Sequence, residues 1–421
     1  MIGIPQHLQV YMKIKQVYEH SYLCVDEAFT ESHFNKLVLY NEANKNLYFD
    51  VGYKKIKFKQ YVGVLQVDDL TIEILPKTDK FDDKERWKKV LIEMLLTCGY
   101  IKIKSFDNAN LKIRYASLIE LYFDAFITEA EQIIHQGLTK EYRTQTGNLF
   151  SLKGQLSFNN HITKNIIHKE RFYTAHQVYD KDNKLNQILK NALEIIRGLS
   201  HNYHYKNRCN RLLLVFEDIR KKVFTKPSFD NITYSRKTEH YKTAINLARL
   251  IILNYSPDIS SGTENVLGIL FDMNKLFEAY VLLKLQQAAE KNELIKVVQG
   301  QASKKFWSGK TIRPDIVLEL TSGEKVILDT KWKNRQNGSP DDSDLKQMYA
   351  YNLHFGAKVS LLVYPKSNQK NLKAQPFEFS EAIKSKFANH SCTMYFLDLF
   401  DSNQRLNYNL GDDFLKEIAV T

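Results

Sequence analysis

The chain has 421 residues, more than one hydrophobic core usually organises, so we expect two or three domains. Hydrophobic residues make up 43% of it and aromatic residues 12%, with only 16 glycines and 8 prolines, which indicates a folded protein and excludes a low-complexity chain. The 60 Lys and Arg residues outnumber the 48 Asp and Glu residues, giving a net charge of +12. This surplus is compatible with a polyanionic partner, but many soluble proteins are modestly basic, so charge alone does not establish one.

Cysteine usage and hydropathy point to the compartment. The four cysteines, at positions 24, 98, 209 and 392, are far apart and form no CxxC pair, which favours a reducing compartment. The N-terminal sequence lacks the apolar core of a signal peptide, and no stretch is long enough to span a bilayer. We therefore expect a cytoplasmic protein with no membrane association.

Residues 1–80 form the first expected domain, which is β-rich. Apolar and polar residues alternate in three stretches that are rich in Val, Ile, Tyr and Phe: 8–18, 46–61 and 71–75. The pattern from Leu8 to about Lys77 therefore predicts strands.

Residues 81–258 form a mainly helical middle region. Helical spacing of apolar residues predicts helices over 82–100, 116–138, 183–199 and 243–255, with a short β segment at 147–158. The Ser-, Pro-, Asp- and Gly-rich stretch 256–264 marks the start of the last domain.

Residues 259–421 form the last expected domain. The pattern predicts a helix over 266–291, a strand over 293–298, a hairpin of 313–320 and 324–333, a helix over 342–355 and a strand over 357–364. Strands with helices on both sides imply a mixed α/β sheet, and we expect an α+β protein overall.

The predicted hairpin brings together residues that can carry chemistry. A three-residue turn, Thr321-Ser322-Gly323, would pair Leu320 with Glu324 and place Asp315 opposite Asp329. Side chains alternate along a strand, so Lys331 would lie on the same face as Asp329. A shift of one residue in the register would separate Asp315 from the other two.

Two converging carboxylates repel each other unless a positive charge neutralises them. Mg²⁺ is the natural counter-ion because it takes hard oxygen ligands, keeps waters and can also coordinate a phosphate oxygen. A lysine beside it can hold or deprotonate the attacking water and stabilise the charge that builds on phosphorus. The alternative is that Asp315 only ends a strand and that Asp329 and Lys331 form an exposed ion pair. The apolar run Val326-Ile327-Leu328 argues against this, because it predicts a strand buried on both faces just before Asp329.

The motifs Pro314-Asp315 and Asp329-Thr330-Lys331 resemble the PD-(D/E)XK nuclease superfamily. The resemblance implies an additional metal-associated acid at Glu278, on the helix before the sheet, beside the metal ligands Asp315 and Asp329. It also implies a site role for Gln347 and Tyr351, which match the Q-x-x-x-Y signature of RecB-like members and lie on one helix face. The alternatives are a solvated glutamate at position 278 and ordinary packing for Gln347 and Tyr351.

Four further runs of sequence narrow the resemblance. FDMNKLFEAYV, RPDIVL, DTKWK and DLKQMYAY together are similar to the McrC family, the nuclease subunits of McrBC modification-dependent (5-methylcytosine-type) restriction systems. The likeness extends more diffusely to residues 61–77 and to the KGQLSF and DKDNKLNQILKNAL regions. It implies an endonuclease that uses Mg²⁺, or Mn²⁺ as a substitute, and cuts double-stranded DNA together with a hexamer of an McrB-like AAA+ GTPase, which it stimulates.

The division of labour implied by this family fits a chain with no nucleotide site of its own. The only stretch similar to a phosphate-binding loop is Gly309-Lys310-Thr311, and the glycine required five residues earlier is Lys304. Two alternatives stay open: a stand-alone RecB-like nuclease, and an assembly or regulatory subunit with a weak nuclease site.

Two further clusters carry less weight. His201, His204 and Cys209 give three zinc-ligand candidates without a clear fourth. The basic run 206–211, with Arg220, Lys221 and Lys222, could contact phosphates, but a solvated helix face is the favoured interpretation.

Overall fold

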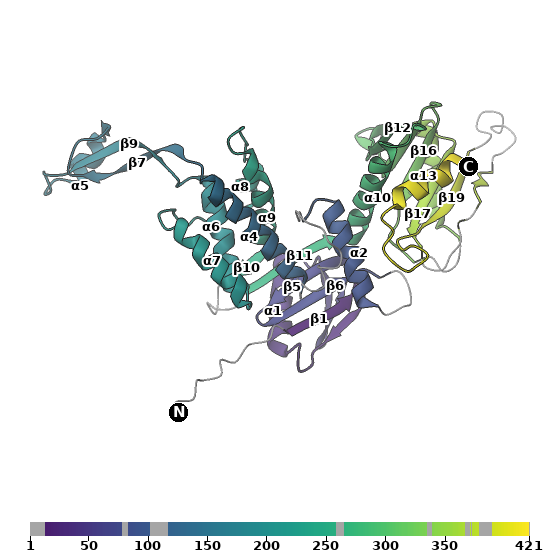
Figure 1. Cartoon of the computed structure of the whole chain (residues 1–421), viewed down its shortest axis with the longest axis horizontal. Coiled ribbons are helices and arrows are strands. Elements are labelled where there is room, and N and C mark those ends of the chain that lie inside the picture. The colour runs from purple at the N-terminus through teal and green to yellow at the C-terminus, as the bar shows by residue number, and fades with distance from the viewer. Residues whose placement is uncertain are drawn as a thin grey trace. The chain divides into compact units, whose positions relative to one another are not determined.

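The computed structural model describes residues 13–77, 83–101, 117–257, 265–334, 339–366, 371, 373–378 and 390–420 (Figure 1). These residues form two compact units. One contains the described residues of 105–269 together with 66–69, and the other those of 14–65, 70–104 and 270–421. The described residues of the first and last predicted segments therefore belong largely to one unit, while the predicted boundaries at 80 and 258 stay a prediction. No helix among the described residues has the length and apolar character needed to cross a membrane.

The strands expected in the N-terminal segment are present from residue 13 onward. Strands β1, β6 and β5 are neighbours in that order, and β2, β4 and β3 form a separate three-stranded sheet. Every residue of β6 is buried, so this strand lies in the core of its sheet. The expected strand residues 8–12 lie outside the described part. The bounds are β1 Lys13–Tyr18, β2 Tyr22–Cys24, β3 Phe49–Gly52, β4 Lys55–Phe58, β5 Tyr61–Val67 and β6 Leu70–Leu75.

A helix, α1 (Glu31–Ala43), interrupts this β-rich segment and was not predicted. Thr30 caps its N-terminus by accepting a hydrogen bond from the backbone of His33, whose side chain accepts in return from the Thr30 backbone. This is a capping box with histidine at the position where Glu or Gln is usual. The histidine hides the capping signal in the sequence.

Helix α2 (Lys84–Thr97) confirms the prediction for 82–100. Its N-cap is Asp83, and its expected apolar face is buried, comprising Trp87, Val90, Leu91, Met94 and Leu95. Two buried ion pairs fix the helix to its neighbours, with Lys88 3.0 Å from Glu73 on β6 and Glu93 2.9 Å from Lys284. Because buried charges are costly unless paired, these contacts are specific to one arrangement of the elements.

The helices predicted in the middle region are present, with one more long helix than predicted. The predicted helices appear as α4, α6 and α9, which pack with the additional helix α7 around a shared core. The predicted β segment is part of a larger hairpin in which β7 pairs with β9 along its whole length. The bounds are α4 Leu118–Gln136, β7 Glu141–Leu149, β8 Gln155–Leu156, α5 Phe158–Lys164, β9 Phe172–Asp180, α6 Lys184–Leu199, α7 Tyr203–Val215, α8 Lys226–Asp230 and α9 Lys242–Leu253.

The predicted helix over 266–291 is wrong in its first seven residues. They belong to strand β11 (Asn265–Asp272), which pairs with β10 (Tyr255–Pro257), and helix α10 (Met273–Ala289) follows directly. The run VLGILF is apolar on all sides and so fits a buried strand as well as a helix. Asp272 decides the boundary, because its side chain caps α10 by accepting from the backbones of Asn274 and Lys275. Residues 258–264 of the predicted interdomain break lie outside the described part.

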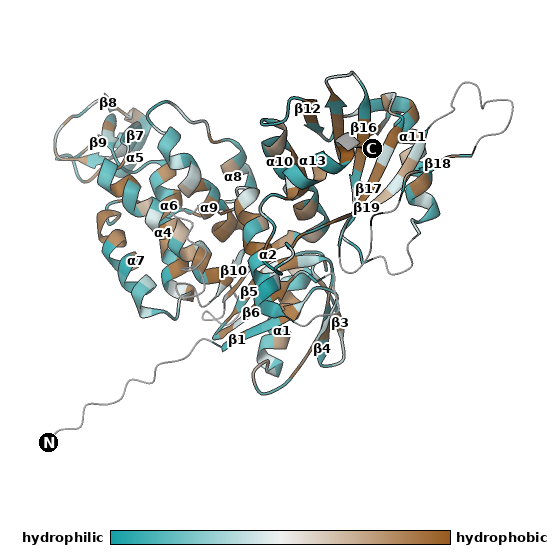
Figure 2. Cartoon of the chain, turned by 45° about the vertical axis from the view of Figure 1, so that its right-hand side comes forward, coloured by the Kyte–Doolittle hydropathy of each residue, from teal (hydrophilic) through white to brown (hydrophobic). Residues whose placement is uncertain are grey.

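The C-terminal sheet is mixed, as expected. Its strand order is β12-β15-β16-β17-β19-β18, in which β16, β17 and β19 run parallel and the other pairs are antiparallel. Helix α11 packs on one face, and α10 also contacts β16. Hydrophobic residues, brown in Figure 2, run along its central strands. The bounds are β12 Ile295–Gly300, β13 Lys304–Trp307, β14 Lys310–Ile312, β15 Ile316–Leu320, β16 Lys325–Thr330, α11 Asp342–Phe355, β17 Val359–Pro365, β18 Gln375–Pro376, β19 Ser391–Leu397 and α13 Leu410–Val420.

Candidate nuclease active site

The β15–β16 hairpin has the register predicted from its turn. Ile316 pairs with Leu328 and Glu319 with Lys325, and the amide of Leu320 donates to the carbonyl of Glu324. Gly323 has a φ of +86°, the left-handed conformation that the turn requires. Continued by one residue, this register places Asp315 opposite Asp329, so the prediction is confirmed.

Asp315 is anchored to the opposite strand by Thr330. The Oδ2 atom of Asp315 accepts a 2.7 Å hydrogen bond from the Thr330 amide and a 2.8 Å hydrogen bond from its hydroxyl. These two bonds occupy one carboxylate oxygen and fix the orientation of the other. Thr330 was not singled out in the sequence, although its place inside D-T-K is the only signal that could have identified it.

Asp329 is the most deeply buried carboxylate of the site, with 2% of its surface exposed. It lies near the carboxyl end of β16, where all three preceding residues are buried. Burial, and then the charge of Asp315, raise the pKa of Asp329 to about 6 despite the opposing effect of Lys331. Two carboxylates that raise each other's energy in this way favour a bound cation.

Lys331 follows β16 and supplies part of that positive charge. Its Nζ lies 2.7 Å from Asp329 Oδ2 and 3.6 Å from Asp344 Oδ1 on α11. Burial alone would lower the pKa of Lys331, but the charges of Asp329, Asp344 and Asp315 outweigh it and raise the pKa. The side chain is therefore an ammonium at neutral pH. Asp344 was not predicted, although it lies three residues before Gln347 and thus on the same helix face.

Gln347 and Tyr351 hold the segment that leads into Asp315. The Gln347 amide donates a 2.6 Å hydrogen bond to the Tyr351 hydroxyl, which in turn donates to the carbonyl of Arg313 at 2.9 Å. Burial, followed by the charges of Asp329 and Asp315, raises the pKa of Tyr351, so the hydroxyl keeps its proton and remains a donor. Both residues thus act on the backbone two positions before Asp315.

Glu278 on α10 is connected to Asp315 through Gln301. Its Oε1 accepts a 2.7 Å hydrogen bond from the side chain of Gln301, whose amide donates to the carbonyl of Asp315 at 2.8 Å. Burial, and to a lesser extent the charge of Asp315, raise the pKa of Glu278. Gln301, which was not predicted, therefore links the two acids, and its φ of +50° is a conformation that few non-glycine residues adopt.

The donor set suits Mg²⁺ with substrate present. Among the residues that the structure describes, no group of three or more His, Cys, Asp and Glu side chains is arranged to hold a metal. Mg²⁺ does not require such a cage, because it usually keeps several waters and binds one or two carboxylates together with substrate phosphates. Asp315 and Asp329 would supply such a pair of hard oxygen ligands, and a divalent cation would relieve their mutual repulsion.

Comparison with known proteins shows the family to which the chain belongs. A family described as McrBC 5-methylcytosine restriction system component matches residues 56–365, which is more than half of the chain and includes every candidate site residue described above. The chain belongs to the McrBC family. The resemblance seen in the sequence is thereby confirmed at the level of this family. None of the curated proteins matches the chain.

Solved structures of McrBC assemblies are similar to this McrBC-family chain. The refined half-complex from a tetradecameric assembly of Thermococcus gammatolerans McrB AAA+ hexamers with bound McrC has a TM-score of 0.70 at 21% identity, covering 97% of this chain and 100% of that one. A cryo-EM structure of the T. gammatolerans McrBC complex has a TM-score of 0.49 at 22% identity, covering 66% and 88%. The first similarity shows that the fold is shared along nearly the whole chain.

Trp332, the residue after Lys331, is held from the N-terminal part of the same unit. Its indole donates a 2.6 Å hydrogen bond to Glu19 Oε1, and its ring packs edge-on against Trp87 and Phe277. Phe277 directly precedes Glu278. Burial raises the pKa of Glu19 to about 7 against the effect of the hydrogen bonds from Trp332 and Lys77. A buried cluster thus contacts both segments that carry candidate site residues of this McrBC-family chain, Trp332 after Lys331 and Phe277 before Glu278.

The remaining candidates from the sequence have structural roles. His201 hydrogen-bonds to the carbonyl of Asp68, and burial raises the pKa of Cys209 to about 12, so neither is placed as a zinc ligand. Arg208 bridges Asp124 and Glu131. Arg220 and Lys221 pair with Asp182 and Glu194, and Gly309 lies in the β13–β14 turn.

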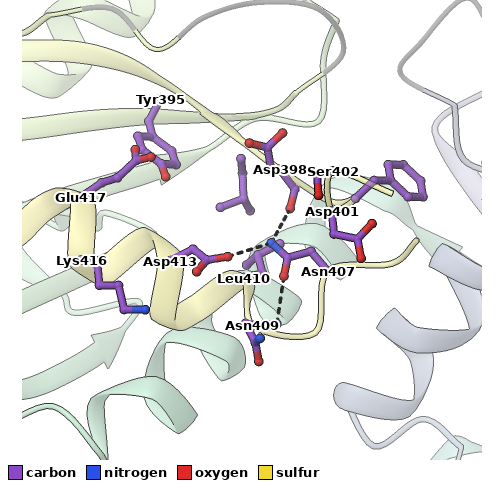
Figure 3. Close-up of a pocket in the computed structure, with 12 residues that line it drawn as sticks. Tyr395, Asp398, Asp401, Ser402, Asn407, Asn409, Leu410, Asp413, Lys416 and Glu417 are labelled. Atoms are coloured by element: carbon purple, nitrogen blue, oxygen red, sulfur yellow. Dashed lines mark hydrogen bonds between the residues drawn. The ribbon is translucent and has the colours of Figure 1, made fainter. Parts of the chain in front are cut away.

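A hollow of about 540 Å³ lies apart from these residues, between β19, the following loop and α13 (Figure 3). Asn407, which lines the hollow, donates hydrogen bonds to the carbonyl of Asp398 at 3.3 Å and to the side chain of Asp413 at 3.1 Å. None of the six predicted site residues lines it. The two hydrogen bonds of Asn407 connect α13 to the end of β19.

Proposed function

We propose that this chain is the nuclease component of an McrBC-type restriction system and hydrolyses phosphodiester bonds of double-stranded DNA with Mg²⁺ held by Asp315 and Asp329. The observation that carries the proposal is the register of the β15–β16 hairpin, which brings the two aspartates opposite each other with Lys331 beside them. Two carboxylates can hold a metal ion for phosphodiester hydrolysis, and a lysine beside them can stabilise the negative charge that develops on the phosphate.

Each residue then has a role that follows from its contacts. A metal bound by the two aspartates would polarise the phosphate and lower the pKa of water. Thr330 fixes the orientation of Asp315, while Tyr351 and Gln347 fix the backbone before it. Lys331, kept positively charged by Asp329 and Asp344, stabilises the negative charge that grows on the phosphate as water adds and a deoxyribose oxygen leaves. Glu278 supports the site from the side of Asp315.

Family membership and fold support a partner of the McrB type. The similar structure contains McrB AAA+ hexamers with bound McrC. The described residues of this chain offer no phosphate-binding loop at Gly309, which lies in a two-stranded hairpin turn. We therefore propose that an McrB-like GTPase supplies nucleotide hydrolysis and recognition of 5-methylcytosine-type modification, and that this chain stimulates it and cuts.

Cleavage of matched methylated and unmethylated duplexes by the purified chain with its cognate GTPase, GTP and Mg²⁺ tests the proposal. Loss of metal-assisted stabilisation is worth several kcal/mol, so Asp329→Ala should reduce cutting by on the order of 10³-fold while GTP hydrolysis persists. Glu324→Gln, in the turn at the other end of the same hairpin, is the matched control and should cut normally. Chelation of the metal should stop cutting, and Mn²⁺ should restore it.

The outcomes separate the proposal from its alternatives. Undiminished cutting by Asp329→Ala would remove the assigned site. Metal-dependent cutting by the isolated chain at the rate of the complex would identify a stand-alone nuclease. Stimulation of the GTPase without any cutting would identify a regulatory subunit.

A further inference from the structure

The β13–β14 hairpin projects from the edge of the sheet that carries the candidate active site. The amide of Gln301, the residue after β12, donates a 2.8 Å hydrogen bond to the carbonyl of Asp315. This bond joins the two ends of the segment 301–315 that contains the hairpin. Only Arg313 and Pro314 separate β14 from Asp315. Since an extended residue spans about 3.5 Å, Ile312 lies within roughly 10 Å of Asp315 along the chain.

Two side chains of the hairpin hold it against α11. The Nζ of Lys304 donates a 2.8 Å hydrogen bond to the carbonyl of His354 and lies 4.8 Å from the centre of the Phe355 ring. The ring of Phe306 packs edge-on against His354 at 5.2 Å. These contacts at the last turn of α11 position the hairpin next to the helix that carries Asp344, Gln347 and Tyr351.

Apart from Ile312, which packs partly against the core of the sheet, the other side chains of β13 and β14 are exposed. Trp307 is 75% exposed, whereas the other two tryptophans of the chain, Trp87 and Trp332, are buried. Trp307 pairs directly with Lys310 across the hairpin, so the two side chains lie on one face. Lys305 is also exposed. A large aromatic ring left in water beside a lysine is the combination found where proteins contact nucleic acid.

The charge of the hairpin complements that of the site. Residues 300–313 contain four basic residues and no acidic one. The site itself holds four carboxylates, those of Glu278, Asp315, Asp329 and Asp344. They outnumber the ammonium of Lys331 and the two cations whose charges act on Glu278, Lys275 and Arg313. A phosphate chain that approaches such a site is repelled unless nearby cations offset the acids, and the hairpin supplies them within reach.

We propose that the β13–β14 hairpin is a DNA-contacting element of the nuclease: Lys305 and Lys310 bind backbone phosphates a few nucleotides from the scissile bond, and Trp307 packs against a sugar or base. The inference rests on the proposed function, because the ligand is the duplex that the site would cut. The hairpin is rigidly placed, since Lys304 and Phe306 fasten it to α11.

Equilibrium binding of a fluorescent 30-base-pair duplex tests the inference, with the full chain assembled on its cognate GTPase and Ca²⁺ in place of Mg²⁺ so that no cutting occurs. Each phosphate contact contributes about 0.9 to the slope of log affinity against log salt. Lys305→Gln and Lys310→Gln should each lower that slope by about one. Trp307→Ala should weaken binding by at least about fivefold with the slope unchanged, because stacking is not ionic.

Lys55→Gln is the matched control, since it removes one exposed charge on β4, which belongs to the separate three-stranded sheet β2-β4-β3. It should leave both affinity and slope unchanged. Equal slopes for wild type, Lys305→Gln and Lys310→Gln would overturn the inference. Weaker assembly of these variants with the GTPase in size-exclusion chromatography would also overturn it, because the hairpin would then be a protein contact.

The binding assay separates this inference from the proposed function. Wild-type cutting with unchanged binding by the hairpin variants refutes only the hairpin's role. Cutting that survives Asp329→Ala refutes only the assigned catalytic site, because the salt slopes are measured without cleavage.

Discussion

Two antiparallel strand pairs of this protein, β15–β16 and β7–β9, differ in how many of their side chains are buried. In β15–β16, eight of the eleven strand residues are buried, and the turn leads back to the candidate catalytic residues. In β7–β9, nine cross-strand pairs form, yet Thr174 is the only buried residue of the two strands. The same backbone pattern therefore serves two environments, and only the buried hairpin can hold a carboxylate such as Asp329 away from water.

The contrast explains how each hairpin is stabilised. Packing on both faces of β16 fixes side-chain positions to the accuracy that metal ligands require. The β7–β9 hairpin relies instead on cross-strand pairs, such as Arg143 with Asp180 and the rings of Tyr142 and Tyr179, 4.7 Å apart. Such pairs contribute a fraction of what core packing contributes.

The largest effect should come from the buried hairpin. Ile327 has no exposed surface and packs among β17, β19 and α11. Ile327→Ala should lower the free energy of unfolding of this unit by about 2–5 kcal/mol, because it leaves a cavity that the sheet cannot close. Urea denaturation followed by far-UV circular dichroism measures the loss, with Glu324→Gln in the same hairpin as control. A loss below about 1 kcal/mol would show that the buried hairpin is no better packed than the exposed one.

The end of the buried hairpin also depends on an acid far away in the sequence. Glu19 accepts from the indole of Trp332, and its pKa is raised from 4.5 to about 7. The folded state therefore binds this proton more tightly than the unfolded state, so the contribution of Glu19 to stability is present below pH 4.5 and is lost as the pH rises to about 7.

Glu19→Gln keeps an acceptor for Trp332 but removes the charge. Relative to wild type it should gain stability between pH 4.5 and 8, by up to roughly 3 kcal/mol, since each pKa unit corresponds to about 1.4 kcal/mol. Thermal unfolding at a series of pH values measures this difference. The exposed Glu27→Gln serves as control and should follow wild type. A pH dependence that is identical in Glu19→Gln and wild type would mean that Glu19 is not the buried titrating group.

Sequence was informative where the signal is local. The register of β15–β16 follows from one glycine turn and the alternation around it, and the presence of α2 follows from its acidic first turn and its helical apolar face. It failed where two local patterns compete, as in VLGILF, which became strand β11. It also could not supply partners brought in by tertiary folding. Thr330, Asp344 and Gln301 carry no motif of their own, and the contact between Glu19 and Trp332 spans 313 residues.

The smallest effect should come from the exposed hairpin. Tyr142 is 75% exposed and contacts Tyr179 across the strands. Tyr142→Ala should therefore lower the free energy of unfolding of its unit by less than about 1 kcal/mol, the usual contribution of one cross-strand aromatic pair. Hydrogen exchange of the β7 and β9 amides measures the local effect, and Phe126→Ala in the fully buried part of α4 provides the contrast of about 3–5 kcal/mol expected for a core aromatic. A loss above about 2 kcal/mol for Tyr142→Ala would contradict this expectation. It would mean that the face of the hairpin that carries Tyr142 is buried against another surface in solution.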